Sequence, residues 1–198
     1  MFFSLQFLVN SMVGEYLNND DLRYKILSCK LLPCLRRALN KDLTNKLIYL
    51  MWHDNNKTVR KVAAQTLGRT GRGQNVHDEL CSRLQSKDVN DRIEALRKIQ
   101  YLGVMTAKLL IPFLECFKDD YINVRELACK AAQKLQVKDE NIILALVELA
   151  QYDKIPKVKA RAIESNKIFI ANYPLFWFEL NPKFNFSQFN RVLNQNYV

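Results

Sequence analysis

The sequence predicts an all-α protein, a right-handed α-α superhelix of about five stacked helical hairpins. One observation is a short segment that recurs five times, with a basic residue followed three and four positions later by small or apolar residues. Another is the spacing of the basic residues, which lie 35, 32, 33 and 34 residues apart. Such a period is typical of solenoids. The copies are RYKILSCKLL (23–32), TVRKVAAQTL (58–67), NDRIEALRKI (90–99), NVRELACKAA (123–132) and KVKARAIESN (157–166).

Each copy is predicted to be the second helix of a hairpin, because its apolar positions form one helical stripe. An amphipathic stretch before each copy supplies the first helix, and the apolar N-terminus MFFSLQFLVNSMVG is expected to be a buried helix of this kind. Pro112 is expected to kink its helix, and Pro156 to stand in the first turn of one. The predicted solenoid domain is 1–170, with hairpins near 1–33, 40–70, 75–103, 105–136 and 139–170.

The turns inside the hairpins carry aspartates that accept hydrogen bonds from free backbone N–H groups. The basic residue of each copy is expected to pair with an aspartate of its own or the adjacent repeat, forming a ladder between repeats. In the third copy Ser86 stands where the aspartate is expected, so Asp88 or Asp91 is predicted to replace it. The predicted ladder residues are Asp54, Arg60, Arg92, Asp119, Arg125, Asp153 and Lys159.

The segments DNNKTVRKVAAQTLGRTG, KDVNDRIEALRKIQYLG and KDDYINVRELACKAAQKL resemble the HEAT-repeat superfamily, in particular its short phycobilisome-lyase-like repeats. The resemblance covers roughly residues 15–168. It implies an armadillo-type fold whose second helices line the concave surface. It also implies a protein-binding scaffold, since most members have that role.

The repeat pattern ends near Ala171, and residues 171–198 form an aromatic-rich tail. One interpretation is a cap in which Phe176, Trp177 and Phe178 cover the last repeat. Another is a non-repeat end, such as a splice product of a longer solenoid, and a third is an exposed peptide-binding anchor. Asn166 and Lys167, at and beside a core position, favour a frayed end.

Composition and cysteine use limit the class of protein. An apolar content of 48% argues against disorder, and a formal charge of +10 suits nucleic acid, acidic lipid or an acidic protein surface. No run reaches the roughly 18 apolar residues of a membrane span, so no membrane insertion is expected. Five cysteines without a CxxC pair fit reduced thiols. An intracellular, cytoplasmic location is expected, with cytoskeletal, ciliary or nuclear sites left open.

No arrangement of residues typical of an enzyme occurs. His53 and His77 are each followed by an acid, but the chain lacks the repeated His-Glu pairs of di-iron HEAT-like hydroxylases. They are expected to be surface or turn histidines. Trp52 is expected in the core or rim rather than in a glycosylase-type groove. Cys29 and Cys129 are expected in the core. Neither a catalytic residue, a metal nor a cofactor is predicted.

A basic stripe is predicted along the second helices. Counting from the basic residue of each copy, position +5 holds Lys30, Arg97 and Lys130, and position +9 holds Arg69 and Lys134. Three interpretations remain open: a solvated face, a surface for an acidic protein, or a nucleic-acid site. The sequence therefore predicts a non-catalytic protein-interaction scaffold that presents a basic concave surface to an acidic partner. The alternative is nucleic-acid binding, including the HEAT-like glycosylase type.

Overall fold

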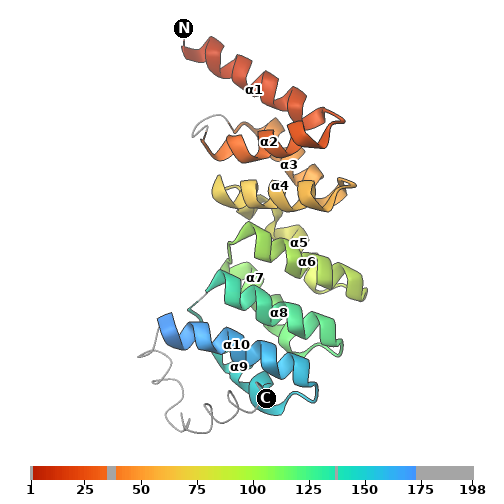
Figure 1. Cartoon of the computed structure of the whole chain (residues 1–198), viewed down its shortest axis with the longest axis vertical. Helices are drawn as coiled ribbons and strands as arrows, with labels where there is room; N and C mark the ends of the chain where they lie inside the picture. Colours follow the sequence, from red (N-terminus) through yellow and green to blue (C-terminus); the bar gives the residue numbers. More distant parts are fainter. Residues whose placement is uncertain (1, 35–38, 137, 173–198) are drawn as a thin grey trace. The chain divides into compact units, whose positions relative to one another are not determined.

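A computed structural model describes residues 2–34, 39–136 and 138–172, with side chains from residue 8 onward. Within these ranges the protein is all-helical and contains no strand, so the predicted all-α class is confirmed (Figure 1). The tail interpretations involving Phe176, Trp177 and Phe178 lie outside the described residues. The helices are α1 (Phe2–Asn18), α2 (Leu22–Leu31), α3 (Lys41–His53), α4 (Lys57–Arg69), α5 (His77–Leu84), α6 (Val89–Leu102), α7 (Ala107–Glu115), α8 (Ile122–Leu135), α9 (Glu140–Tyr152) and α10 (Pro156–Asn172).

The chain divides into two compact units. The first comprises Met1–Leu80 and Lys98–Thr106, and the second comprises Cys81–Arg97 and Ala107–Val198. Helices α5 and α6 therefore contribute residues to both units. Each unit has its own buried core.

In the first unit α4 packs against both α2 and α3. Cys29 of α2 and Ala63 and Leu67 of α4 are fully buried, as the predicted apolar stripe requires. The hydroxyl of Thr66 donates to the backbone oxygen of Cys29 at 2.7 Å. A small buried hydroxyl thus joins the backbones of two successive second helices, because no bulky side chain separates them.

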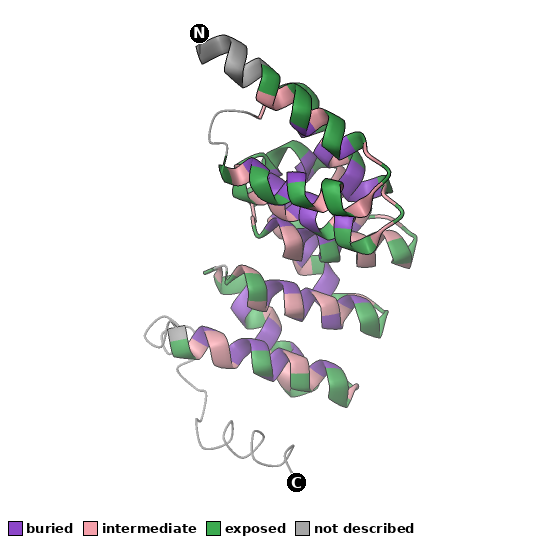
Figure 2. Ribbon diagram, turned by 45° about the horizontal axis from the view of Figure 1, so that its top comes forward, coloured by how far each residue is buried: buried purple, intermediate pink, exposed green. Residues whose placement is uncertain are grey.

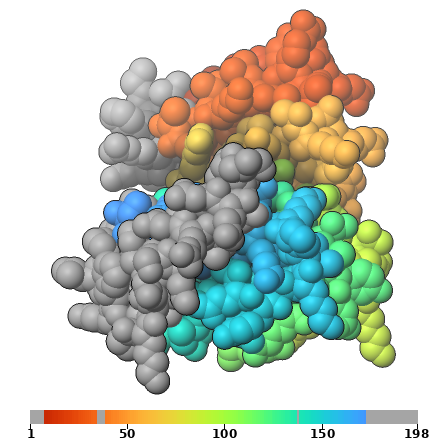
Figure 3. Space-filling model, turned by 60° about the horizontal axis from the view of Figure 1, so that its bottom comes forward, coloured from red at the N-terminus to blue at the C-terminus, as the bar shows by residue number. Residues whose placement is uncertain are grey.

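The second unit repeats this arrangement. Helix α10 packs against α8 and α9, and Figure 3 shows the surfaces of α9 and α10, in cyan and blue, adjoining each other. Ala128, Cys129 and Ala132 of α8 are fully buried. The hydroxyl of Ser165 donates to the backbone oxygen of Cys129 at 3.0 Å. The same position in the repeat therefore makes the same interhelical bond in both units.

Side-chain caps and prolines set several helix boundaries. Asn40 caps α3 by accepting from the Leu43 N–H at 2.8 Å, and Asp139 caps α9 by accepting from the Asn141 N–H at 3.0 Å. Pro156 begins α10, as predicted, where its missing N–H costs no bond. Pro112 lies inside α7, which gives way to a 3-10 turn at Cys116.

The structure differs from the predictions at both ends of the helical region. Within residues 8–18, where the side chains of α1 are described, only Val13 and Leu17 are buried, because this part of the helix packs against its neighbours with one face (Figure 2). The expected fraying at Asn166 does not occur. Helix α10 continues to Asn172, and Asn166 is only 1% exposed. Phe169 extends the buried face one turn further, which keeps α10 regular.

Gly68 tests the close packing in the first unit. A Cβ at Gly68 would overlap the backbone carbonyl of Leu102, which has no freedom to rotate away. We expect Gly68→Ala to lower the free energy of unfolding by at least about 1–3 kcal/mol, the range for overpacked cores. The measurement is chemical denaturation of the full chain.

Gly14→Ala is the matched control for this substitution. A Cβ at Gly14 meets only Leu43 Cδ2 at 3.8 Å, an ordinary van der Waals contact. Because alanine favours helix by about 1 kcal/mol over glycine, we expect this variant to be neutral or more stable. Equal losses in the two variants would contradict the assigned close approach.

Candidate functional site

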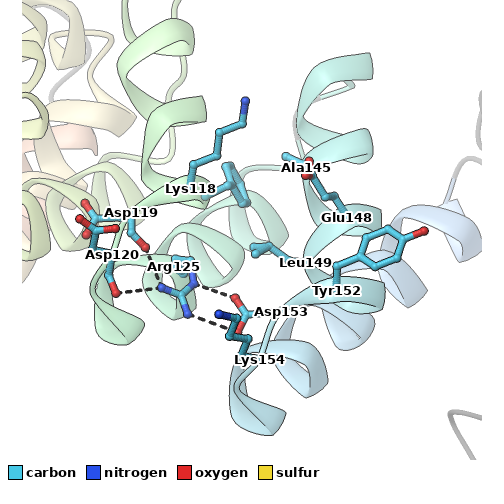
Figure 4. Close-up of a pocket in the computed structure, with 11 residues that line it drawn as sticks. Lys118, Asp119, Asp120, Arg125, Ala145, Glu148, Leu149, Tyr152, Asp153 and Lys154 are labelled. Atoms are coloured by element: carbon cyan, nitrogen blue, oxygen red, sulfur yellow. Dashed lines mark hydrogen bonds and ion pairs between the residues drawn. The ribbon is translucent and has the colours of Figure 1, made fainter.

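Arg125 of α8 joins two consecutive hairpins of the second unit (Figure 4). Its Nη1 donates to the backbone oxygens of Asp119 at 2.6 Å and Asp120 at 3.1 Å, in the turn before its own helix. Its Nε and Nη2 donate to the two carboxylate oxygens of Asp153 at 2.7 and 3.2 Å. Asp153 also accepts from the Ile155 N–H at 2.8 Å. One guanidinium group therefore donates to acceptors in two turns, and its contact with the Asp153 carboxylate is bidentate.

Arg92 makes the same contacts one hairpin earlier. Its Nη1 donates to the backbone oxygens of Ser86 at 2.7 Å and Lys87 at 3.2 Å. Its Nε and Nη2 donate to the Asp119 carboxylate at 2.7 and 3.2 Å. Asp119 also accepts from the Tyr121 N–H at 2.9 Å. The sequence left open whether the aspartate belongs to the same or the adjacent repeat; here the carboxylate comes from the adjacent repeat.

The first unit contains a shorter version of this contact. Lys25 Nζ lies 3.0 Å from the Asp54 carboxylate, and Asp54 accepts from the Asn56 N–H at 2.8 Å. Arg60 donates to the backbone oxygens of Asp54 and Asn55 at 2.6 and 3.2 Å. Lys25 therefore contacts only the carboxylate of the next hairpin. The arginines of the second unit contact that carboxylate and also the backbone oxygens of their own turn.

The expected replacement of the missing aspartate by Asp88 or Asp91 is wrong. Arg92 bonds the backbone oxygen of Ser86, so its own turn needs no carboxylate at that position. Asp91 instead accepts from Ser86 Oγ at 2.9 Å and pairs with Arg83 at 3.2 Å. Asp88 accepts from the Asn90 N–H at 2.8 Å. The predicted pairing of Lys159 with an aspartate is also wrong, since Lys159 donates to the Gln151 backbone oxygen at 3.0 Å.

The Asp153 carboxyl is held in its charged form. Burial raises the pKa of Asp153. The hydrogen bonds from Arg125 and the Ile155 N–H, together with the charge of Arg125, lower it by more, so the pKa lies below its usual value. The Asp153 side chain is only 3% exposed. A charged carboxylate at that depth requires its partners, because an unpaired buried charge is strongly unfavourable.

Beside this contact lies an open pocket of about 420 Å³. Phe117, Ala145 and Leu149 supply apolar lining, and Tyr152 on α9 is 76% exposed (Figure 4). Outside the arginine contacts, the charged residues of the lining are Lys118, Asp120, Glu148 and Lys154. Their two positive and two negative charges cancel. The pocket therefore has room for a side chain of a partner but no net charge that selects one.

The five residues of the predicted basic stripe do not all have the expected surroundings. Lys30, Arg69, Arg97 and Lys134 are exposed, with Lys30 and Arg69 in the first unit and the others in the second. Lys130 differs from the other four, because it is held by a buried carboxylate. Its Nζ lies 2.6 Å from Glu126, one helical turn earlier on α8.

Glu126 is the centre of a cluster that the sequence did not reveal. It is 5% exposed, and its carboxylate contacts Lys130 at 2.6 Å, Lys157 at 2.8 Å and Arg161 at 3.9 Å. Burial raises the Glu126 pKa, but the hydrogen bonds from the two lysines outweigh it and the pKa lies below its usual value. Arg161 also pairs with Glu164 at 2.5 Å. Two of the cations come from α10, so no local pattern around Glu126 predicts them.

The buried thiols offer no nucleophile at neutral pH. Burial raises the pKa of Cys29, Cys116 and Cys129 to about 12 in each case, so these thiols stay protonated. Cys29 and Cys129 occupy the core, as predicted. In the part of the chain that the structure describes, no group of three or more His, Cys, Asp or Glu side chains is placed to hold a metal ion.

The histidines and the tryptophan differ in their surroundings. His53 is exposed and lies beside Tyr49, with ring centroids 5.1 Å apart. His77 was expected on the surface or in a turn, and that is wrong. It is 4% exposed, and its Nδ1 lies 3.0 Å from the Thr106 hydroxyl. Trp52 is buried, as predicted, with Lys98 Nζ 5.5 Å from its ring centroid.

A comparison of the chain with models of known protein families found no family that matches. Among the described residues, no helix is both long and apolar enough to cross a bilayer.

Replacing Arg125 and Arg97 separately tests the two roles predicted for basic residues. We expect Arg125→Ala to lower the free energy of unfolding by at least about 1–3 kcal/mol, because the buried Asp153 carboxylate and two carbonyls lose their donor. Arg97 is exposed, so Arg97→Ala is expected to change it by no more than about 0.5 kcal/mol. Equal losses on chemical denaturation would contradict this assignment.

The Asp153 contact also predicts a dependence on pH. Because the folded pKa of Asp153 is depressed, its stabilisation is complete above the unfolded pKa of about 3.9 and is lost as pH falls through the folded value. We expect wild type to exceed Asp153→Asn in melting temperature at neutral pH, and the difference to shrink towards about pH 2.5. Thermal melts of both proteins at each pH measure this. A difference that does not change with pH would show that ionisation of Asp153 is unimportant.

Proposed function

We propose that the protein is a non-catalytic interaction scaffold that binds an acidic surface of a partner protein. In this proposal the hairpins are HEAT-like repeats that stack into a right-handed superhelix, and the second helices form the binding face. The support is the period of the sequence, the ladder of charged contacts within each unit, and the cations of α8 and α10.

The Glu126 cluster is the observation that carries the proposal. Lys130, Lys157 and Arg161 converge on one buried carboxylate, while their own side chains remain 34%, 68% and 29% exposed. The carboxylate restricts where the cations lie without removing them from solvent. Charged groups that are held in place before binding lose less entropy when a partner arrives.

The charge of this surface favours an anionic partner. Three cations of the cluster face Glu126 and Glu164, which leaves one positive charge in excess. Lys134, which is exposed, follows Lys130 by one helical turn on α8 and is a further cation of this helix. Arg97 of the same unit is also exposed. Long-range attraction by such a surface increases the rate of association and gives it a dependence on salt.

The experiment uses a labelled poly-glutamate peptide as the probe, with binding followed by fluorescence anisotropy at low and at physiological salt. The test variant combines Arg97→Gln, Lys134→Gln and Lys157→Gln. Lys130 is left unchanged so that the buried Glu126 keeps one lysine partner when the more exposed Lys157 is replaced, and a thermal melt of the variant checks that its fold is retained. We expect wild type to bind the probe, binding to weaken with salt, and the test variant to lose at least about tenfold in affinity.

The matched control combines Lys87→Gln, Lys118→Gln and Lys154→Gln, three exposed lysines at or beside the turns. It has the same net charge as the test variant and is expected to bind like wild type. If both variants lose affinity equally, only net charge matters and the proposed face is a solvated surface. If single-stranded DNA binds tightly at physiological salt while the peptide does not, the nucleic-acid alternative replaces the proposal.

A further inference from the structure

The first hairpin carries an apolar face that nothing in the described structure covers. On α1 the exposed apolar side chains recur every four residues, and on α2 they recur after three and four, so each set forms one stripe. Half of the twelve large apolar side chains that are exposed in the described residues belong to these two stripes. We call them the α1/α2 apolar face: Leu8, Met12, Tyr16, Tyr24, Leu27 and Leu31, each between 38% and 55% exposed.

The two stripes form one continuous surface. Helices α1 and α2 pack against each other, and the rings of Tyr16 and Tyr24 stack with centroids 5.3 Å apart and planes 12° from parallel. The face is separate from Cys29 and Leu32, which are buried in the core of the unit. The six side chains of the face are therefore not part of the buried core through which the hairpin packs into its unit.

The size of this face suits an interface between proteins. Aromatic side chains bury roughly 150–250 Å² each when covered. With the lower end of that range taken for the leucines and the methionine, six side chains that are about half exposed present on the order of 500 Å². The largest apolar patch on a typical monomer covers roughly 300–600 Å² and is often functional. A standard interface takes about 800 Å² from each partner, polar rim included. An apolar centre of this area with a charged rim comes close to that requirement.

The rim of the face has opposite charges at its two ends. Glu15 and Asp20 are exposed near the turn between α1 and α2, and Lys30 is exposed near the far end of α2. Asp21 is already paired with Arg23 at 2.7 Å. A surface with this polarity is complementary to itself when one copy is reversed, because the acidic end of each copy then meets Lys30 of the other.

We propose that the α1/α2 apolar face binds the same face of a second copy of this chain, in a two-fold symmetric antiparallel dimer. A two-fold interface uses the same patch on both copies and closes at two. Apolar contact supplies the affinity, and the rim charges select the antiparallel orientation. A lipid surface fits less well, since amphipathic helices that bind membranes carry cations around the apolar face, whereas among the described residues of this rim the acids Glu15 and Asp20 and the Asp21–Arg23 pair accompany Lys30.

The experiment measures the mass of the full chain by sedimentation over a range of concentrations. We expect a monomer–dimer equilibrium with no larger species. Met12→Glu combined with Leu27→Glu places charges in the centre of the face and is expected to yield monomer with unchanged helicity. The matched control, Ile111→Glu with Leu144→Glu, alters two exposed apolar residues elsewhere and should dimerise like wild type.

A charge exchange tests the orientation without disturbing the apolar centre. Lys30→Glu alone is expected to weaken dimerisation several-fold, and Glu15→Lys with Lys30→Glu is expected to restore it, since opposite charges meet again in the antiparallel arrangement. If the Met12→Glu, Leu27→Glu variant fails to fold, the two charge variants still test the proposed dimer. Wild type that stays monomeric, that forms open-ended oligomers, or that binds phosphatidylcholine vesicles instead would overturn the proposal, as would a double exchange that fails to restore the dimer.

Discussion

The contact on which each unit depends is the bond between a basic side chain and the aspartate of the following hairpin. Arg125 shows why arginine serves best, because its planar fork reaches two carbonyls on one side and a carboxylate on the other. The aspartate in turn accepts a backbone N–H of its own turn. Three turn groups and two hairpins are therefore fixed by one side chain, and the turns cannot shift without leaving buried charges unpaired.

This constraint at the turns explains the small residues further along the second helices. Once the turns set the spacing of successive hairpins, the helices meet at a separation that only small side chains fit. Thr66 and Ser165 then donate to the backbone of the preceding second helix, each to the oxygen of a buried cysteine. A hydroxyl at this depth must find an acceptor. The polar contacts at both ends of the helices thus specify the same packing that the apolar stripe stabilises.

The sequence predicts those features that depend on local pattern. Helix type, the hairpin period, the buried Cys29 and Cys129 and the role of Pro156 follow from spacing alone. Contacts between repeats follow only in part. Arg60, Arg92 and Arg125 bond a carbonyl of their own turn six residues earlier. The aspartate side chains that Lys25, Arg92 and Arg125 reach lie 27 to 29 residues further along the chain. Glu126 shows the limit most clearly. No pattern in the sequence around it predicts its burial, because the cations that hold it come partly from another helix.

The two proposed binding surfaces are expected to respond in opposite ways to an increase in salt concentration. Attraction between the exposed cations and an acidic partner weakens as salt screens the charges, with a Debye length of about 8 Å at physiological ionic strength. Apolar association of the α1/α2 face loses only the contribution of its rim, and salts that are excluded from protein surfaces strengthen it. Salt is therefore expected to separate the two proposed interactions. A partner held by charge would dissociate under conditions in which a dimer held by Leu8, Met12 and Leu27 would persist.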